Sequence, residues 1–143
     1  MSHQKIIAYT DGGSRGNPGI AGSGAYITYA DGHVIKEAYR SLGIKTNNFA
    51  EYEAVILALE EMKKFFGKEK LKDLDIEIRM DSELVQRQLT GRYRVKDKTL
   101  QLQFMKLTNL IKEGFPEIKF THVRREQNKD ADRLSNVAMD LSC

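Results

Sequence analysis

The sequence predicts one α/β domain in which helices cover a mixed β-sheet. Its first third contains three strand-like segments separated by turn signals, and the remainder alternates helical and strand-like segments. Three consecutive strands followed by such alternation are typical of a mixed sheet with helices packed against it. The chain has 143 residues, of which 41% are hydrophobic and 30% charged, so it can form a hydrophobic core. We therefore expect residues 1–143 to fold as one domain.

Three strands are expected at the start of the chain. Lys5–Thr10 is a short apolar run and is expected to be a buried strand. The glycines and the proline within Ser14–Gly19 indicate a loop. Ala25–Tyr29 and Val34–Arg40 are the next two expected strands, and the Asp-Gly dipeptide between them is typical of a hairpin turn.

One long helix is expected next. Its apolar residues recur at the spacing of a helix face, at Tyr52, Val55, Ile56, Leu59, Met62 and Phe66. Gly67 is expected to end this helix, and the charged stretch Lys68–Asp73 to be a surface connection. Leu74–Met80 then has the composition of a fourth strand.

The last third is expected to supply three helices and one strand. Ser82 is expected to cap a short helix, and Thr99 to cap another that stops at Gly114. Ile118–Val123 is the expected fifth strand, and Asn128 is expected to cap a final helix. The predicted order of strands and helices is therefore βββαβααβα.

Four acidic residues lie at distinctive places in this pattern. Asp11 and Asp81 each follow an expected strand, which is where open α/β sheets place their ligand sites. At about 100° per residue, Glu51 lies beside the apolar face of the long helix, whereas Glu53 points away from that face and is expected to be solvated. Asp132 is expected one turn inside the final helix and away from its outer surface.

If folding gathers these four carboxylates, they form a negative site of oxygen ligands, which hard cations such as Mg²⁺ require. Each residue taken alone has another interpretation. Asp81 could cap a helix, Asp132 could be a first-turn acid stabilised by the helix dipole, and Asp11 could be a turn residue. Glu51 alone is only an acid near the edge of a helix face. The conjunction of the four supports a metal site.

Four motifs in order carry a resemblance to a known family: YTDGGSRGNPG, TNNFAEYEA, RMDSELV and NKDADRLS. With these motifs, the chain resembles the type 1 ribonuclease H family from Lys5 to about Met139. The resemblance implies a ribonuclease H-like fold, with a five-stranded mixed sheet of order 3-2-1-4-5 flanked by helices. It also implies the short bacterial or archaeal-like form, because no room precedes Lys5 for an accessory hybrid-binding domain.

The resemblance further implies an endonuclease that hydrolyses the RNA strand of RNA/DNA hybrids and leaves 5′-phosphate and 3′-hydroxyl ends. Its chemistry would use two Mg²⁺ ions, for which Mn²⁺ can substitute. Asp11 would bridge both ions, Glu51 and Asp81 would complete one site, and Asp132 the other. Two rivals remain open: a 3′–5′ exonuclease or resolvase on the same fold, and a catalytically weak module that only binds hybrids.

Substrate contacts are also implied by the resemblance. The residues concerned are Gly12, Gly13, Ser14, Asn17, Thr46, Asn48 and Glu83. Glycine would let the backbone after Asp11 approach the substrate closely. Arg92, Arg94, Lys96 and Lys98 alternate in sequence, so in an extended segment all four would point one way and could contact phosphates. A solvated loop is the alternative interpretation.

One departure from the family pattern concerns a histidine. Many bacterial members carry it on a glycine-containing loop before the last aspartate, where it helps product to leave. This chain has Arg124-Arg125-Glu126-Gln127 there, so an arginine or glutamate would have to take that role.

Composition bounds the partners and the compartment. The net charge of +3 is compatible with a polyanionic partner. Cys143 is the only cysteine, which favours a reducing compartment. The N-terminal apolar stretch is too short for a signal or membrane segment. We expect a cytoplasmic monomer without membrane contact.

Overall fold

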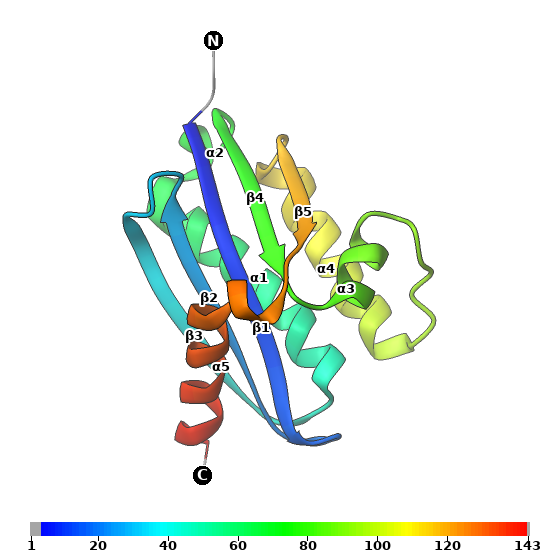
Figure 1. Ribbon diagram of the computed structural model, residues 1–143. Coiled ribbons are helices and arrows are strands. Elements are labelled where there is room, and N and C mark those ends of the chain that lie inside the picture. The colour runs from blue at the N-terminus through cyan, green and yellow to red at the C-terminus, as the bar shows by residue number, and fades with distance from the viewer. Residues whose placement is uncertain (1–3, 143) are drawn as a thin grey trace.

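The computed structural model describes residues 4–142, so the two ends of the expected domain, including Cys143, lie outside the described residues. The strands are β1 Gln4–Gly16, β2 Gly19–Tyr29, β3 Val34–Lys45, β4 Leu74–Met80 and β5 Ile118–His122. The helices are α1 Asn47–Phe66, α2 Lys68–Leu71, α3 Glu83–Leu89, α4 Lys98–Gly114 and α5 Lys129–Leu141, and Arg125–Gln127 forms a 3₁₀ turn. Within residues 4–142, the strands form one sheet of order β3-β2-β1-β4-β5, which confirms the predicted fold (Figure 1).

The sheet is antiparallel on one side of β1 and parallel on the other. β1 pairs with β2, and β2 with β3, in antiparallel fashion. β1 pairs with β4, and β4 with β5, in parallel fashion. The β1–β4 pairing ends at Thr10 opposite Met80, so Asp11 and Asp81 are the next residues on neighbouring strands. The register therefore places these two carboxylates side by side, just after the point where the parallel pairing of β1 and β4 ends.

Helices cover both faces of the sheet (Figure 1). Successive strand residues point to opposite faces. A side chain at Gly12 would meet the α1 backbone at Ala50, and one at Gly13 would meet Met139 of α5. The two helices therefore lie on opposite faces, with α4 packed against α1.

The hydrophobic core lies between the sheet and α1, where the predicted helix face is buried. Tyr52, Val55, Ile56, Leu59 and Met62 are all fully buried. They pack against strand residues of which Ile6, Ala8, Ile27, Ile76 and Ile78 are representative. No helix within residues 4–142 is long and apolar enough to cross a membrane.

Three local predictions were wrong. Ser14–Gly19 is not a loop, because β1 runs to Gly16 and β2 begins at Gly19, with a cis Asn17-Pro18 bond between them. Lys68–Asp73 is more than a surface connection, since it contains the short helix α2 and buries Leu71. The cap of α4 is Asp97, whose side chain accepts a hydrogen bond from the Leu100 amide, and Thr99 lies inside the helix.

Candidate active site

Three carboxylates from three parts of the chain meet where the parallel pairing of the inner strands β1 and β4 ends. Asp11 belongs to β1 and lies opposite Gly24 of β2, so it continues its strand and does not end it as predicted. Asp81 directly follows β4, and Glu51 lies in the second turn of α1. Among the described residues, one ligand oxygen of each carboxylate lies within 4.8 Å of the other two.

The geometry and chemistry of this cluster fit a hard divalent cation. Asp11 is buried, and Glu51 and Asp81 are half-buried, so their charges are only partly screened by water. The ligand atoms are all carboxylate oxygens, which Mg²⁺ prefers over nitrogen or sulfur ligands. The carboxylates carry like charges at close range, and a cation placed between them would relieve that repulsion.

Two members of the cluster, Asp11 and Glu51, hold protons more tightly than usual. Burial, followed by the charge of Asp81, raises the pKa of Asp11 to about 8. Burial, followed by the charges of Asp11 and Asp81, raises the pKa of Glu51 well above its ordinary value. At neutral pH the metal-free site therefore retains protons that a bound cation would displace.

Asp132 approaches this cluster from α5 but is not one of its three members. Its side chain is exposed, so the prediction that it lies away from the outer surface was wrong. A hydrogen bond from Asp132 and its negative charge both contribute to the raised pKa of Asp11. Asp132 is therefore near the cluster on its solvent side, where a second cation could reach it.

Polar contacts between elements hold the cluster in place. The Ser23 hydroxyl of β2 donates to the carbonyl of Ala50 (2.7 Å), directly before Glu51. The side-chain amide of Asn128 donates to the carbonyl of Thr10 (2.9 Å), the residue directly before Asp11. Asn128 thus occupies the predicted cap position of α5, but its side chain makes no capping bond to the helix. These contacts attach α1 to β2 and the start of α5 to β1.

Close packing of α1 explains one glycine of the first motif. A Cβ atom on Gly12 would lie 2.2 Å from the Ala50 carbonyl carbon and 2.4 Å from the Glu51 amide nitrogen. Both neighbours are backbone atoms, so a side chain could enter only if α1 moved away from β1. Gly12 therefore allows Glu51 to approach Asp11, which is a different reason from the close approach of substrate that the sequence suggested.

The cluster opens into a cleft of about 410 Å³. The predicted residues that line it are Asp11, Gly12, Gly13, Ser14, Asn48, Glu51 and Asp81. The predicted residues outside this lining are Asn17, Thr46, Glu83, Arg92, Arg94, Lys96, Lys98 and Asp132. The lining residues that the sequence did not single out as site residues are Arg15, Asn47, Ser82, Arg125, Asn136 and Met139.

Asn17 and Thr46 have structural contacts beside the cleft. The Asn17 side chain accepts a hydrogen bond from the Asn47 amide (3.1 Å), and Asn47 in turn accepts from the Ser14 amide (2.7 Å). Thr46 caps α1 by accepting from the Phe49 amide (3.2 Å). These contacts attach the tip of the β1–β2 hairpin to the start of α1, and Asn48 of that first turn lines the cleft.

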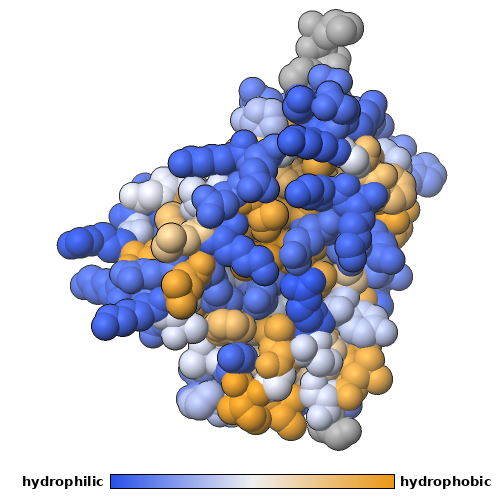
Figure 2. All heavy atoms as spheres, turned by 180° about the vertical axis from the view of Figure 1, so that it is seen from behind, coloured by the Kyte–Doolittle hydropathy of each residue, from blue (hydrophilic) through white to orange (hydrophobic). Residues whose placement is uncertain are grey.

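The basic segment lies between α3 and α4 and is not an extended strand. Residues 91–97 contain a turn and bends, and Lys98 is the first residue of α4. All four basic side chains, Arg92, Arg94, Lys96 and Lys98, are nevertheless exposed. The Arg94 carbonyl accepts from Gln88 (3.3 Å), whose side chain accepts from the buried Tyr52 hydroxyl (2.6 Å), so the segment is attached to α1. Figure 2 shows hydrophilic side chains projecting on this side of the molecule.

The raised pKa values predict that the metal-free protein loses stability as the pH rises. Asp11 has an ordinary value of 3.8 and a folded value of about 8, so the folded state binds more protons in this window. Stability is then highest near pH 4 and falls as the pH rises towards 8. We expect a slope of roughly 1 kcal/mol per pH unit over part of this range.

Urea unfolding at a series of pH values in EDTA measures this slope. Asp11→Asn is expected to reduce it, because the amide does not titrate, and saturating Mg²⁺ is expected to reduce it in the wild type. A slope that is the same in wild type and variant would show that Asp11 does not carry the raised pKa.

Comparison with known proteins places this architecture among characterised relatives. Residues 9–138 match the family model described as "Reverse transcriptase-like". A Halobacterium salinarum protein named "Ribonuclease HI" is 42% identical over 136 residues, which cover 95% of this chain and 65% of that protein. A Mycobacterium tuberculosis "Bifunctional protein" is 39% identical, and the matched region covers 96% of this chain and 36% of that protein. The chain thus spans less than two thirds of either relative.

A solved structure is similar over nearly its whole length. The crystal structure of LC11-RNase H1 in complex with RNA/DNA hybrid is 48% identical to this chain, with a TM-score of 0.91. The match covers 96% of this chain and 98% of that one. At this identity and coverage, the likeness extends beyond the general fold.

Proposed function

The chain belongs to the ribonuclease H family, and we propose that it hydrolyses the RNA strand of RNA/DNA hybrids with two divalent metal ions. The observation that carries this proposal is the cluster of Asp11, Glu51 and Asp81, whose ligand oxygens lie within 4.8 Å of one another. A related structure contains the RNA/DNA hybrid. The substrate of this chain is proposed on that basis.

The four carboxylates have different proposed tasks. Asp11, at the centre, would contact both ions, while Glu51 and Asp81 would complete one site and Asp132 the other. Two such ions, when bound, activate a water and stabilise the leaving 3′-oxygen during in-line displacement at phosphorus. The chain's own contribution is to hold the oxygen ligands where the pairing of β1 and β4 ends. Because the sheet is rigid there, little reorganisation is needed when substrate arrives.

Selectivity for RNA would arise beside the carboxylates. The 2′-hydroxyl is the group that distinguishes an RNA backbone from a DNA backbone. Asn48 lies in the first turn of α1 and lines the cleft together with the backbone of Gly12 and Gly13. These residues place an amide side chain and backbone polar groups in the same cleft as the carboxylates. We propose that they contact the RNA strand, with Asn17, Thr46 and Glu83 placed farther along the hybrid.

We further propose that the enzyme is a cytoplasmic monomer of one domain that uses Mg²⁺, with Mn²⁺ as a substitute. The single cysteine in 143 residues supports a reducing compartment. Light scattering after size exclusion tests the monomer.

A 5′-labelled and a 3′-labelled RNA strand, each annealed to DNA, test the reaction type. An endonuclease gives internal fragments from both labels at early times, and these fragments carry 5′-phosphate and 3′-hydroxyl ends. Release of single nucleotides from the 3′ end would instead indicate an exonuclease on the same fold. Binding without any cleavage would indicate a module that only recognises hybrids.

The exposed basic segment predicts salt-dependent hybrid binding. Replacing Arg92, Arg94, Lys96 and Lys98 together by alanine should weaken binding and flatten its dependence on salt, without changing the metal requirement. Each phosphate contact contributes about 0.9 to the log–log salt slope on B-form DNA. Hybrid affinity measured over a salt series for both proteins tests this, and identical slopes would show that the segment only solubilises the surface.

Replacing a second set of exposed lysines supplies the control. Lys63, Lys64, Lys68 and Lys70 lie on α1 and α2, around the end of α1 remote from Glu51, and are also exposed. Their replacement by alanine removes the same total charge. If both quadruple variants lower the slope equally, net charge rather than the α3–α4 segment determines binding.

A further inference from the structure

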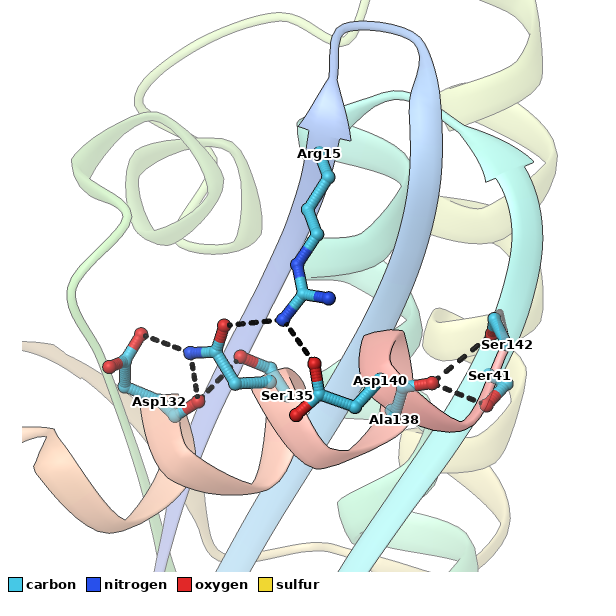
Figure 3. Close-up of polar contacts among 8 residues, drawn as sticks. Arg15, Ser41, Asp132, Ser135, Ala138, Asp140 and Ser142 are labelled. Atoms are coloured by element: carbon cyan, nitrogen blue, oxygen red, sulfur yellow. Dashed lines mark hydrogen bonds and ion pairs between the residues drawn. The ribbon is translucent and has the colours of Figure 1, made fainter.

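A line of polar contacts leads from the β1–β2 hairpin across α5 to Asp132. The Asn136 side-chain nitrogen lies 2.9 Å from the Asp132 carbonyl oxygen and 3.5 Å from its carboxylate Oδ1. The Asn136 Oδ1 lies 3.4 Å from Nη2 of Arg15, and the same Nη2 lies 2.7 Å from Oδ1 of Asp140. Figure 3 shows Arg15 reaching down from β1 to the helix that carries Asp132 and Asp140.

The chemistry of Arg15 determines which way the Asn136 amide faces. A guanidinium group only donates hydrogen bonds, so the amide must present its oxygen to Arg15. Its NH₂ group is then directed towards Asp132, where both oxygen atoms within reach are acceptors. The Asp140 carboxylate pairs with the same Arg15 nitrogen that donates to Asn136. The orientation of Asn136 therefore depends on a residue that is 121 positions away in the sequence.

Stability alone does not explain these contacts. The side chains of Arg15 and Asp140 are 44% and 66% exposed. Exposed ion pairs of this kind typically contribute little to stability. The contacts do, however, end at the one carboxylate of the expected quartet that lies outside the cluster of three. Arg15 and Asn136 both line the cleft.

We infer that Arg15 and Asn136 are positioning residues that direct the Asp132 carboxylate towards Asp11. This inference rests on the proposed function, because it gives Asp132 a task in holding a cation. Asp132 sits on an exposed helix surface, where a carboxylate has several rotamers. A donated NH₂ from Asn136 selects among them, and Arg15 keeps that NH₂ available. Groups that orient ligands in this way usually affect metal affinity or activity by about 10- to 100-fold.

The Asn136→Asp variant is the sharpest test. Aspartate can still accept from Arg15, so the contact with the hairpin is kept, but it cannot donate to Asp132. We expect metal affinity and kcat to fall about tenfold or more. The matched control is Asn109→Asp, which makes the same chemical change on the exposed face of α4.

Arg15 is tested through its dependence on Asn136. Arg15→Ala should lower metal affinity in the same direction but by less, and Arg15→Lys should restore part of it, because lysine can still donate to Asn136. In the Asn136→Asp background, Arg15→Ala should have no additional effect. The matched control is Arg133→Ala, which removes an exposed arginine of α5 that pairs with Glu37 and Asp130.

Three readouts separate positioning from other roles. Calorimetric titration with Mg²⁺ reports the site without substrate, hybrid affinity in EDTA reports substrate contact, and urea unfolding reports stability. The inference requires weaker Mg²⁺ binding, with hybrid affinity in EDTA and stability unchanged. Weaker hybrid binding in Arg15→Ala with unchanged Mg²⁺ affinity would overturn it and make Arg15 a phosphate contact. Unchanged Mg²⁺ affinity in Asn136→Asp would also overturn it.

The proposed function is judged separately on the wild-type protein. If wild type fails to cleave any hybrid in Mg²⁺, the proposed function fails, while the Mg²⁺ titrations still decide whether Asn136 directs Asp132. If wild type cleaves and Asn136→Asp matches it in both kcat and Mg²⁺ affinity, only the positioning inference fails.

Discussion

Asp11→Asn is expected to abolish cleavage of an RNA/DNA hybrid while leaving the fold and hybrid binding intact. Asp11 lies at the centre of the acidic cluster, with Glu51 and Asp81 in ligand distance and Asp132 nearby. Asparagine keeps the shape of the side chain but removes the charge that would contact both cations. Two-metal catalysis should then fall by orders of magnitude. The metal-free variant should be more stable than wild type at pH 8, because a crowded anion is gone.

Single-turnover cleavage in Mg²⁺ measures this effect, and fluorescence anisotropy in EDTA measures hybrid binding. The matched control is Asp130→Asn, an identical change at an exposed acid in the first turn of α5. A rate for Asp11→Asn above about a tenth of the wild-type rate would contradict the two-metal role of this residue.

Glu51→Gln is expected to be nearly as damaging, whereas Glu53→Gln should have little effect. Glu51 faces the cluster, and its ligand oxygen lies within 4.8 Å of those of Asp11 and Asp81. Glu53 lies two residues later and is turned away from the cluster, with Oε2 3.8 Å from Nη1 of Arg40 on β3. Glutamine at position 51 removes one anionic ligand without changing side-chain volume.

The Glu53 control is informative because this side chain is not solvated as the sequence predicted. It is only 16% exposed, so both glutamates of the pair sit in shielded surroundings on the same helix. A loss of activity caused by general damage to α1 should therefore appear in both variants. Equal losses, or a larger loss in Glu53→Gln, would show that Glu51 has no special role.

The elements with strong side-chain periodicity could be predicted from the sequence. The apolar face of α1 and the strand Leu74–Met80 were predicted correctly, because their buried side chains are apolar and recur at regular spacing in the sequence. The first half of β2, Gly19–Gly24, was missed for the opposite reason. A Cβ atom on Gly24 of β2 would lie 2.5 Å from the Ala131 carbonyl oxygen of α5. Glycines that admit a helix leave no side-chain pattern to read.

Helix caps show a similar limit. Asp97 and Thr99 are both good capping residues two positions apart, and the apolar pattern that begins at Leu100 does not distinguish them. Asn128 is at the predicted cap position, but its side chain donates to the Thr10 carbonyl of β1 and does not cap the helix.

The same limit separates the site residues that could be predicted from the sequence from those that could not. Asp11, Glu51 and Asp81 could be singled out because each lies at a marked position of a strand or helix and within a distinctive motif. Arg15 and Asn136 could not, because an arginine in a glycine-rich segment and an asparagine in a polar helix have no distinguishing context. Asn136 lies one helical turn after Asp132 on α5, and only the approach of α5 to β1 brings Arg15 to Asn136.

Cleavage of four labelled substrates decides between hydrolysis of hybrids and the other readings of this site. The RNA is annealed to DNA, annealed to RNA or left single-stranded, and a DNA duplex of the same sequence is the fourth substrate, each with Mg²⁺ or with EDTA. We predict internal cleavage of the RNA/DNA hybrid in Mg²⁺ and its loss in EDTA, with the other substrates cut far more slowly. Hybrid cleavage that persists in EDTA, or equal cleavage of all four substrates in Mg²⁺, would contradict it.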